Sequence, residues 1–270
     1  MKTGRDSDKG EKMNYFASCI YGDYEKYKQI VNDLCLEQND VLWLLGDIIG
    51  GGTIDPEDNF KILDDIMSNS HVKVVLGDHE FAQNMRFLSM ASSAGVYENW
   101  VSFSNELEVS DKALNEYIEN NMSQEDQSPY FGVGGLLLSA ELSEVVQIGD
   151  RYFYLVHGTP SFYREDLLSN WQLQVCTADP NLNVNQWDII RTDPVIRTIK
   201  SSKIPISEKN TITISGQFPP NEAAESIGKK EQNSVIFYSN KVLCIGRRSV
   251  DDPLPVVGID AAGFFVKNVY

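Results

Sequence analysis

The sequence predicts an α/β protein that folds as a single domain. Over the first 76 residues, apolar runs suited to buried strands alternate with amphipathic helical segments. After about residue 136, strand-type runs dominate. The 270 residues contain no repeat or linker, so one domain over residues 14–270 is expected. Residues 1–13 are charged and lack the apolar stretch of a signal peptide, so a disordered tail is expected there.

The amino-terminal half is predicted to alternate strand and helix. The expected strands cover residues 14–20, 41–45 and 72–76, the second of which (VLWLL) is apolar throughout, as in strands buried on both faces. Residues 23–37 carry apolar side chains at helical spacing. A second helix is expected from Pro56 to Asn69, because Asp55 is a good N-cap and proline is favoured at the first helical position. This order predicts a parallel sheet with covering helices.

The remaining chain is predicted to be helical first and then rich in strands. Residues 81–130 have an irregular, mainly helical pattern and are expected to form an insertion in the domain. The expected strands that follow cover residues 152–156, 211–215, 234–239, 241–245 and 264–269.

Composition limits the classes of partner. A net charge of −16 repels nucleic acids and anionic membranes, and no apolar run reaches the ~20 residues of a membrane span. The four cysteines are far apart without a C-x-x-C pair, which is typical of the reducing cytoplasm. An anionic small substrate would need a local positive centre, such as a bound metal ion.

Five expected strands end in polar turns that contain glycine. They read CIYGDY, LLGDIIGGG, VVLGDHE, YLVHGTP and TISGQFPP. Because the carboxyl ends of parallel strands share one edge of a sheet, the side chains of these turns are expected to converge. The titratable residues concerned are Asp47, Asp78, His79 and His157.

This series of turns resembles the motifs of the calcineurin-like metallophosphoesterases, in the branch of the phosphoprotein phosphatases and bis(5'-nucleosyl)-tetraphosphatases. That family carries D-x-H-G-[ND], G-D-x-x-D-R-G, G-N-H-[DE], V-H-x-G and G-H in this order. The resemblance covers roughly residues 14–250. It implies a two-sheet β-sandwich flanked by helices, in α-β-β-α layers, with two divalent ions at the strand ends. Two such ions clamp a phosphate and supply a hydroxide at neutral pH.

The resemblance also implies roles for individual residues. Asp47 matches the carboxylate that bridges the two ions, and Asp78 and His157 match ligands of the second ion. Gln217 stands where the last histidine ligand of that ion belongs, and offers a weak oxygen donor. His79 matches the catalytic histidine that protonates the leaving group without binding metal.

Several positions depart from the family pattern. Cys19 and Tyr21 replace the Asp and His that hold the first ion, and Gly50 and Gly51 replace an Asp and a phosphate-binding Arg. The first metal position is therefore expected to be empty, which leaves at most one divalent ion (Mn, Zn, Fe or Mg). Cys19 and Tyr21 either fill space or act as thiolate and phenolate ligands.

Three arginines are candidates for replacing the lost phosphate contact. Arg247 and Arg248 follow a strand near the sheet edge, and Arg191 lies in a stretch where the family often has a Trp–Arg pair. A plain surface position is the alternative for all three.

The leading functional hypothesis is a metallophosphoesterase fold with a decayed two-metal site. Such a cytoplasmic protein would be silent or slow on phosphoesters and would bind a phosphorylated small molecule or phosphoprotein. The alternative is an active phosphoesterase, on phosphoprotein or dinucleoside polyphosphate, with an altered metal set that includes Cys19. A third hypothesis is an interaction module without site chemistry, which the retained Asp47, Asp78, His79 and His157 disfavour.

Overall fold

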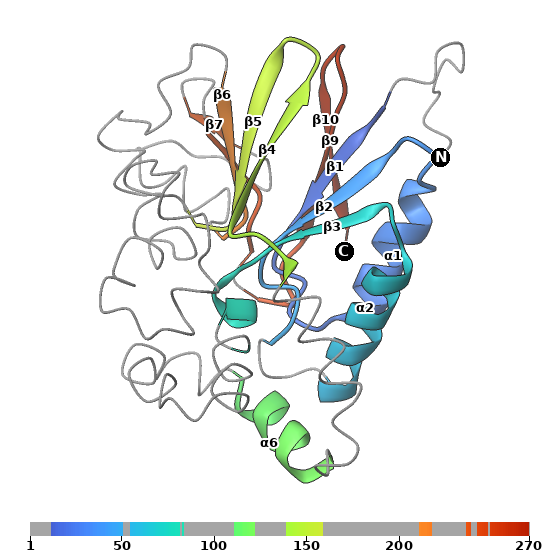
Figure 1. The fold of residues 1–270 in the computed structure, drawn as a ribbon, viewed down its shortest axis with the longest axis vertical. Coiled ribbons are helices and arrows are strands. Elements are labelled where there is room, and N and C mark those ends of the chain that lie inside the picture. Colours follow the sequence, from blue (N-terminus) through green and yellow to red (C-terminus); the bar gives the residue numbers. More distant parts are fainter. Residues whose placement is uncertain are drawn as a thin grey trace.

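The structure is a computed structural model in which two five-stranded sheets pack face to face, with helices on the outer face of one of them (Figure 1). It describes residues 12–50, 55–81, 83, 111–121, 139–158, 211–217, 236–238, 242–247 and 249–269.

The first sheet contains the amino-terminal strands, in the order β10-β9-β1-β2-β3. Its parallel part consists of β1 (Asn14–Ala17), β2 (Val41–Leu45) and β3 (Val72–Val75). The carboxyl-terminal hairpin of β9 (Leu254–Ile259) and β10 (Phe264–Val269) joins antiparallel to β1. The two ends of the chain therefore meet in one sheet.

The second sheet has the order β4-β5-β6-β8-β7. Its three central strands, β5 (Arg151–Val156), β6 (Thr211–Ser215) and β8 (Val242–Cys244), are parallel to one another. Antiparallel strands β4 (Ser143–Ile148) and β7 (Ile236–Tyr238) form its edges.

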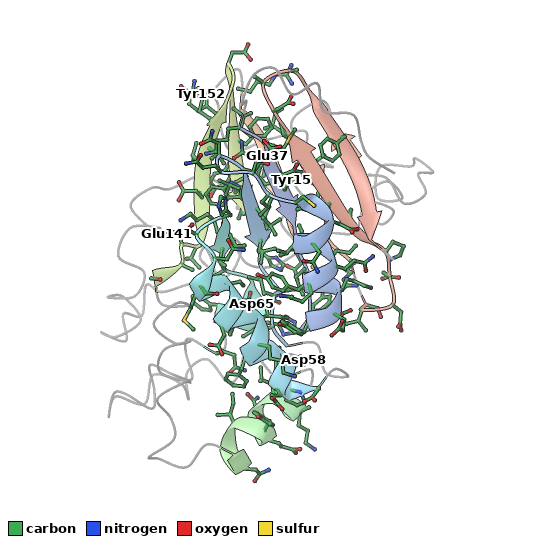
Figure 2. The ribbon with its side chains drawn as sticks, turned by 90° about the vertical axis from the view of Figure 1, so that its right-hand side faces the viewer. Tyr15, Glu37, Asp58, Asp65, Glu141 and Tyr152 are labelled. Carbon is green, nitrogen blue, oxygen red and sulfur yellow. The ribbon has the colours of Figure 1, made fainter. Side chains whose placement is uncertain are left out.

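The described helices are α1 (Tyr24–Leu34), α2 (Pro56–Ser68) and α6 (Lys112–Asn121). Helices α1 and α2 are capped at their N-termini by Asp23 and Asp55, whose carboxylates accept backbone N–H groups of the first turn. Both helices cover the outer face of the first sheet (Figure 1). They are linked at the surface by Lys28 and Asp65, 3.2 Å apart, and Asp65 is labelled on α2 in Figure 2. Among the described residues, no helix has both the length and the hydropathy that crossing a membrane requires.

Side-chain alternation along the strands builds two cores. In β1, Tyr15 and Ala17 pack toward the helices, whereas Phe16 packs between the sheets with Leu45 of β2. The core between the sheets is completed by apolar side chains of the second sheet, such as Leu155 and Ile214. Because both faces of the first sheet are buried, its strands read as continuous apolar runs.

Most predicted elements are confirmed, with shifted ends. Strand 14–20 was predicted too long, because β1 ends at Ala17 and the chain then turns, and the helix over 23–37 ends at Leu34. Strands β4 and β9 were not predicted. Of the expected insertion at 81–130, residues 112–121 form α6, whereas residues 82, 84–110 and 122–130 lie outside the described part. Residues 1–11 of the expected tail lie outside it as well.

Candidate metal centre

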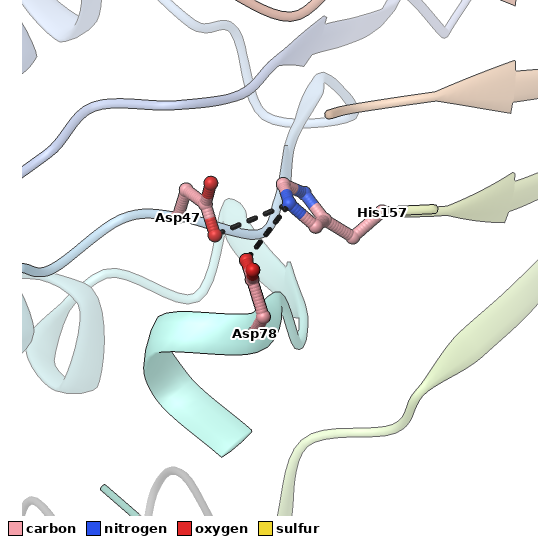
Figure 3. Close-up of side chains that lie close together, drawn as sticks. All are labelled: Asp47, Asp78 and His157. Carbon is pink, nitrogen blue, oxygen red and sulfur yellow. Dashed lines mark ion pairs between the residues drawn. The ribbon is translucent and has the colours of Figure 1, made fainter. Parts of the chain in front are cut away.

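Three side chains from both sheets meet at the carboxyl ends of the strands. Asp47 follows β2, Asp78 follows β3 and His157 follows β5, and their ligand atoms all lie within 4.8 Å of one another. The Nε2 atom of His157 is 3.1 Å from Asp47 Oδ1 and 3.5 Å from Asp78 Oδ1 (Figure 3). The structure thus brings together three of the four residues that the sequence placed at this edge, and His79 follows Asp78 directly.

The orientation of His157 is fixed from the first sheet. Its Nδ1 donates to the carbonyl oxygen of Leu45 at 2.6 Å, which leaves Nε2 facing the two carboxylates. Gly46, with φ of +79°, permits this approach, because a Cβ atom at position 46 would collide with the imidazole. A backbone carbonyl bound to Nδ1 is the arrangement that orients histidine for metal binding through Nε2.

Asp47 is held by a buried glutamate that the sequence analysis did not assign. The carboxylate of Glu80 accepts the backbone N–H groups of Asp47, Ile48, Ile49 and Gly77 at 2.7–2.9 Å. These bonds stabilise the turn in which Asp47 has φ of +52°. The signal was present in the sequence, since Glu80 matches the last position of the G-N-H-[DE] motif.

Burial and mutual charge perturb the three groups strongly. Burial, with the charge of Asp78, raises the pKa of Asp47 to about 7. Burial also acts to raise the pKa of Asp78, but the close approach of His157 and the charges of both histidines hold that pKa below its usual range. Burial acts to lower the pKa of His157, yet the two carboxylates raise it well above the ordinary value. The group therefore retains protons at neutral pH unless a cation replaces them.

The turn after β1 contains Cys19 and Tyr21 and lies against the turn after β2. Backbone N–H groups of Cys19 and Tyr21 donate to the carbonyls of Gly46 and Asp47 at 3.0 and 2.9 Å. The Cys19 Sγ atom is 3.3 Å from the carbonyl of Gly216 and 3.9 Å from Asp47 Oδ2. Burial raises the pKa of the Cys19 thiol and, well beyond its usual range, the pKa of the Tyr21 phenol.

Arg247, one of the three candidate phosphate ligands, is 2% exposed, and its guanidinium is hydrogen-bonded to backbone carbonyls. Its guanidinium donates to the carbonyls of Cys19, Ile20, Val250 and Asp252 at 2.6–3.2 Å. The hydroxyl of Tyr21 donates in turn to the Arg247 carbonyl at 3.0 Å. Arg247 thus ties the Cys19–Tyr21 turn to the segment after β8, and its phosphate-binding role stays a prediction. The other two candidates, Arg191 and Arg248, lie outside the described residues.

His79 is paired with an aspartate that no sequence pattern indicated. Its Nδ1 lies 2.7 Å from Oδ1 of Asp111, at the start of α6, and the ring of Tyr21 packs edge-on at 5.8 Å between centroids. Burial acts to lower the pKa of His79, but the charge of Asp111, with those of Asp47 and Asp78, raises it well above the ordinary value.

Gln217 is held beside His157 by its backbone N–H, which donates to the His157 carbonyl at 2.8 Å. Its Oε1 is buried and has no hydrogen bond to a described residue. A pocket of about 590 Å³ lies at the opposite, amino ends of β2 and β3 beside Asp40 and His71. It contains no member of the candidate centre and is not part of it.

A two-sheet sandwich with such a group at its strand ends is the architecture of a metal-dependent phosphoesterase. The chain belongs to the calcineurin-like phosphoesterase family, whose sequence profile matches residues 15–245. A comparison with curated protein sequences gave no significant match.

Solved structures share the fold at low sequence identity. A protein serine/threonine phosphatase from Saccharomyces cerevisiae is similar with a TM-score of 0.54 and 11% identity, over 97% of this chain and 81% of the other. A metallophosphoesterase from Sphaerobacter thermophilus gives 0.52 and 13%, over 97% and 89%. A putative diadenosine tetraphosphatase gives 0.51 and 13%, over 96% and 94%.

The side chains present fit one divalent ion. Asp47 Oδ1 and His157 Nε2 are buried and make no well-formed hydrogen bond with a described residue, although they face one another. Two carboxylates and an imidazole form a donor set that suits Zn, Mn or Fe. At the first-ion position, the Tyr21 hydroxyl is hydrogen-bonded to the backbone and Cys19 is a buried thiol of raised pKa.

Proposed function

We propose that the protein holds a single divalent metal ion between Asp47, Asp78 and His157 and uses it to bind a phosphorylated ligand. Hydrolysis of phosphoesters would be near background. The proposal rests on one observation. The buried ligand atoms of Asp47, Asp78 and His157 lie within 4.8 Å of one another, and the Leu45 carbonyl orients the imidazole of His157.

The charge of the trio favours a cation. Two ionised carboxylates beside a neutral imidazole would bury two negative charges, and buried charge is costly unless compensated. Protons compensate it in the metal-free protein, as the raised pKa of Asp47 (about 7) indicates. A divalent ion would compensate both charges, and Gln217 Oε1 is an additional oxygen donor nearby.

The same ion would give the ligand its binding site. In a chain of net charge −16, a metal ion is the available positive centre for an anionic phosphate. A phosphorylated small molecule or a phosphoprotein is the proposed ligand class, in line with the similarity to a protein serine/threonine phosphatase and a putative diadenosine tetraphosphatase. Nucleic acids and membranes are not proposed partners.

Slow hydrolysis is proposed because two stabilising groups are missing. A second ion stabilises the far end of an in-line displacement, and position 51 lacks the family's phosphate-binding Arg. Loss of one charge-stabilising group typically costs about 10²–10³ in rate.

Metal analysis tests the proposal directly. Protein purified without chelator should contain about one divalent ion per chain, and titration of the metal-free protein with Mn²⁺ should give one site. His157→Asn should abolish that site, whereas His71→Asn, at a histidine outside the centre, should not. Two ions per chain, or binding that survives His157→Asn, would contradict the proposal. Turnover of an aryl phosphate at tens per second with a simple divalent ion would contradict the slow-hydrolysis part.

An active enzyme with Cys19 as a metal ligand is the second candidate. It is favoured by the 3.9 Å approach of Cys19 Sγ to Asp47 Oδ2. Cobalt substitution separates the two, because a thiolate ligand adds an intense near-ultraviolet charge-transfer band that carboxylate and imidazole ligands do not give. We expect no such band in the cobalt-substituted protein. A band that is present in the wild type and lost in Cys19→Ser would establish the second candidate.

A further inference from the structure

We propose that Asp111 is the residue that positions His79 beside the metal centre, supplying from α6 a carboxylate that position 50 of this chain lacks. The inference deepens the proposed function, since a positioned His79 matters there for contact with the metal-held phosphate. It also gives a role to the described part of the 81–130 segment.

The contact is short and closed to solvent. Asp111 is 2% exposed and His79 is 7% exposed, and Oδ1 and Nδ1 are 2.7 Å apart. A carboxylate at this distance fixes Nδ1 as the donor, so Nε2, across the ring, is the nitrogen left for a ligand. The edge-on ring of Tyr21 limits rotation of the imidazole from the other side.

A side chain at position 50 would reach the same place as the Asp111 carboxylate. A Cβ atom at position 50 would collide with both Asp111 Oδ1 and His79 Nδ1. A side chain at position 50 would therefore point into the space that the Asp111–His79 pair fills. The G-D-x-x-D-R-G pattern has an aspartate at this position, and here glycine leaves that space to a carboxylate from a different segment.

Helix α6 is anchored well enough to place that carboxylate. Its Leu114 and Ile118 are part of the helix-side core, and the ring of Tyr117 lies 5.9 Å from that of Phe60 on α2. The carbonyl of Asp111 accepts the N–H of Asn115, which places Asp111 at the N-terminal cap position of α6. A carboxylate on a packed helix is held more firmly than one on a free loop.

The test is a relocation of the carboxylate in the full-length protein. Proton–nitrogen NMR of the histidine side chains is simple to assign, because the chain has only three histidines. In metal-free protein, His79 should show a downfield, slowly exchanging Nδ1–H signal. Asp111→Ala should remove it, and Asp111→Asn, which keeps an acceptor oxygen, should retain it with a smaller downfield shift. Glu116→Ala, at an exposed position of the same helix, is the control and should change nothing.

Gly50→Asp is then compared in the two backgrounds. In the wild-type protein it should lower the melting temperature, because the new side chain meets Asp111 and the backbone has φ of +83°. In the Asp111→Ala protein, where the clash with His79 Nδ1 remains, the new carboxylate should bring back the His79 signal only in part. If Asp111→Ala leaves the signal unchanged, the inference is overturned.

A binding measurement separates positioning from folding. With Mn²⁺-loaded protein, Asp111→Ala should weaken inorganic phosphate binding by about 10-fold, as removal of an orienting partner does elsewhere, and leave Mn²⁺ affinity unchanged. Equal loss of both affinities would indicate a merely structural role and overturn the inference. Because the NMR test uses metal-free protein, failure of the proposed metal site would not be mistaken for failure of this inference.

Discussion

Three non-glycine residues at the candidate centre have a left-handed backbone, which is uncommon outside glycine. They are Cys19 and Tyr21, each with φ of 57°, and Asp47 with φ of 52°. Such conformations cost about 1–3 kcal/mol each and persist where the surroundings impose them. Here the surroundings are the backbone bonds between the two turns and the Glu80 carboxylate. The backbone strain is thus concentrated in the two adjoining turns that contain Cys19, Tyr21 and Asp47.

Asp47→Asn should remove metal binding and flatten the pH dependence of stability. The pKa of Asp47 is about 7 in the folded protein and lower when unfolded, so the folded state binds the extra proton between about pH 4 and 7. Its contribution to stability is present below that window and is lost as pH rises through it. His157, whose pKa is also raised, acts in the same direction. Asparagine tolerates a left-handed backbone, so the variant should fold.

Thermal melts in chelator across pH 5 to 8 measure this effect. The metal-free wild type should melt at a lower temperature as pH rises, and Asp47→Asn should show a smaller decline. Asp65→Asn, at the surface of α2, is the control and should follow the wild type. A wild-type melting temperature that rises steadily over this range would contradict the prediction.

Cys19 should resist alkylation in the native protein, whereas Cys35 should react. Cys35 is exposed, but Cys19 is buried and its pKa is raised, so little reactive thiolate forms. Mass spectrometry of iodoacetamide-treated peptides measures both positions, and unfolding in guanidinium should expose Cys19 to the reagent. Labelling of Cys19 as fast as Cys35 would show that its thiol is accessible and ionised.

Strand β2 and strands β6 and β10 were predicted with the correct bounds, because each is a compact run of residues with high strand preference. Strand β9 was missed because it contains Pro255 and Gly258, which disfavour a strand in sequence. It forms because β1 and β10 pair with it on both sides. Strand β4 is half-exposed, so its apolar signal is weak.

The residues of the candidate centre also differ in whether the sequence could predict them. Asp47, Asp78, His79 and His157 were predictable, because each follows a strand within a recognisable motif. Asp111 was not, since a lone aspartate before a helix ordinarily reads as a cap and its contact with His79 depends on how α6 packs on α2. Tertiary packing, which sequence pattern does not encode locally, decides that contact.

Gly46→Ala should damage the centre far more than Gly149→Ala. Both glycines have positive φ, at +79° and +61°, so both variants pay about 1–2 kcal/mol for a left-handed alanine. Only at position 46 would the added methyl group collide with His157, whereas at position 149 the nearest atom is 3.4 Å away. Melting temperature and Mn²⁺ titration measure the difference. Gly46→Ala should lose Mn²⁺ binding and Gly149→Ala should keep it, and equal behaviour would refute the role of close packing.

The candidate centre joins the two halves of the molecule. Asp47 and Asp78 come from the first sheet, and His157 and Gln217 come from the second. The polar connections across this junction include the His157–Leu45 bond and the contact of Cys19 with Gly216. An ion bound by both sheets would therefore act as a cross-link between them.

Divalent metal should consequently stabilise the whole domain. A ligand that binds only the folded state adds about 2.7 kcal/mol at a concentration 100 times its dissociation constant. Because the ligands belong to both sheets, Mn²⁺ should raise the melting temperature of one cooperative transition and not that of a separate part. Differential scanning calorimetry with Mn²⁺ and with chelator measures the shift. His157→Asn should abolish it and His71→Asn should retain it. A shift that survives His157→Asn would place the ion elsewhere, since no ion could then bridge the sheets through this histidine.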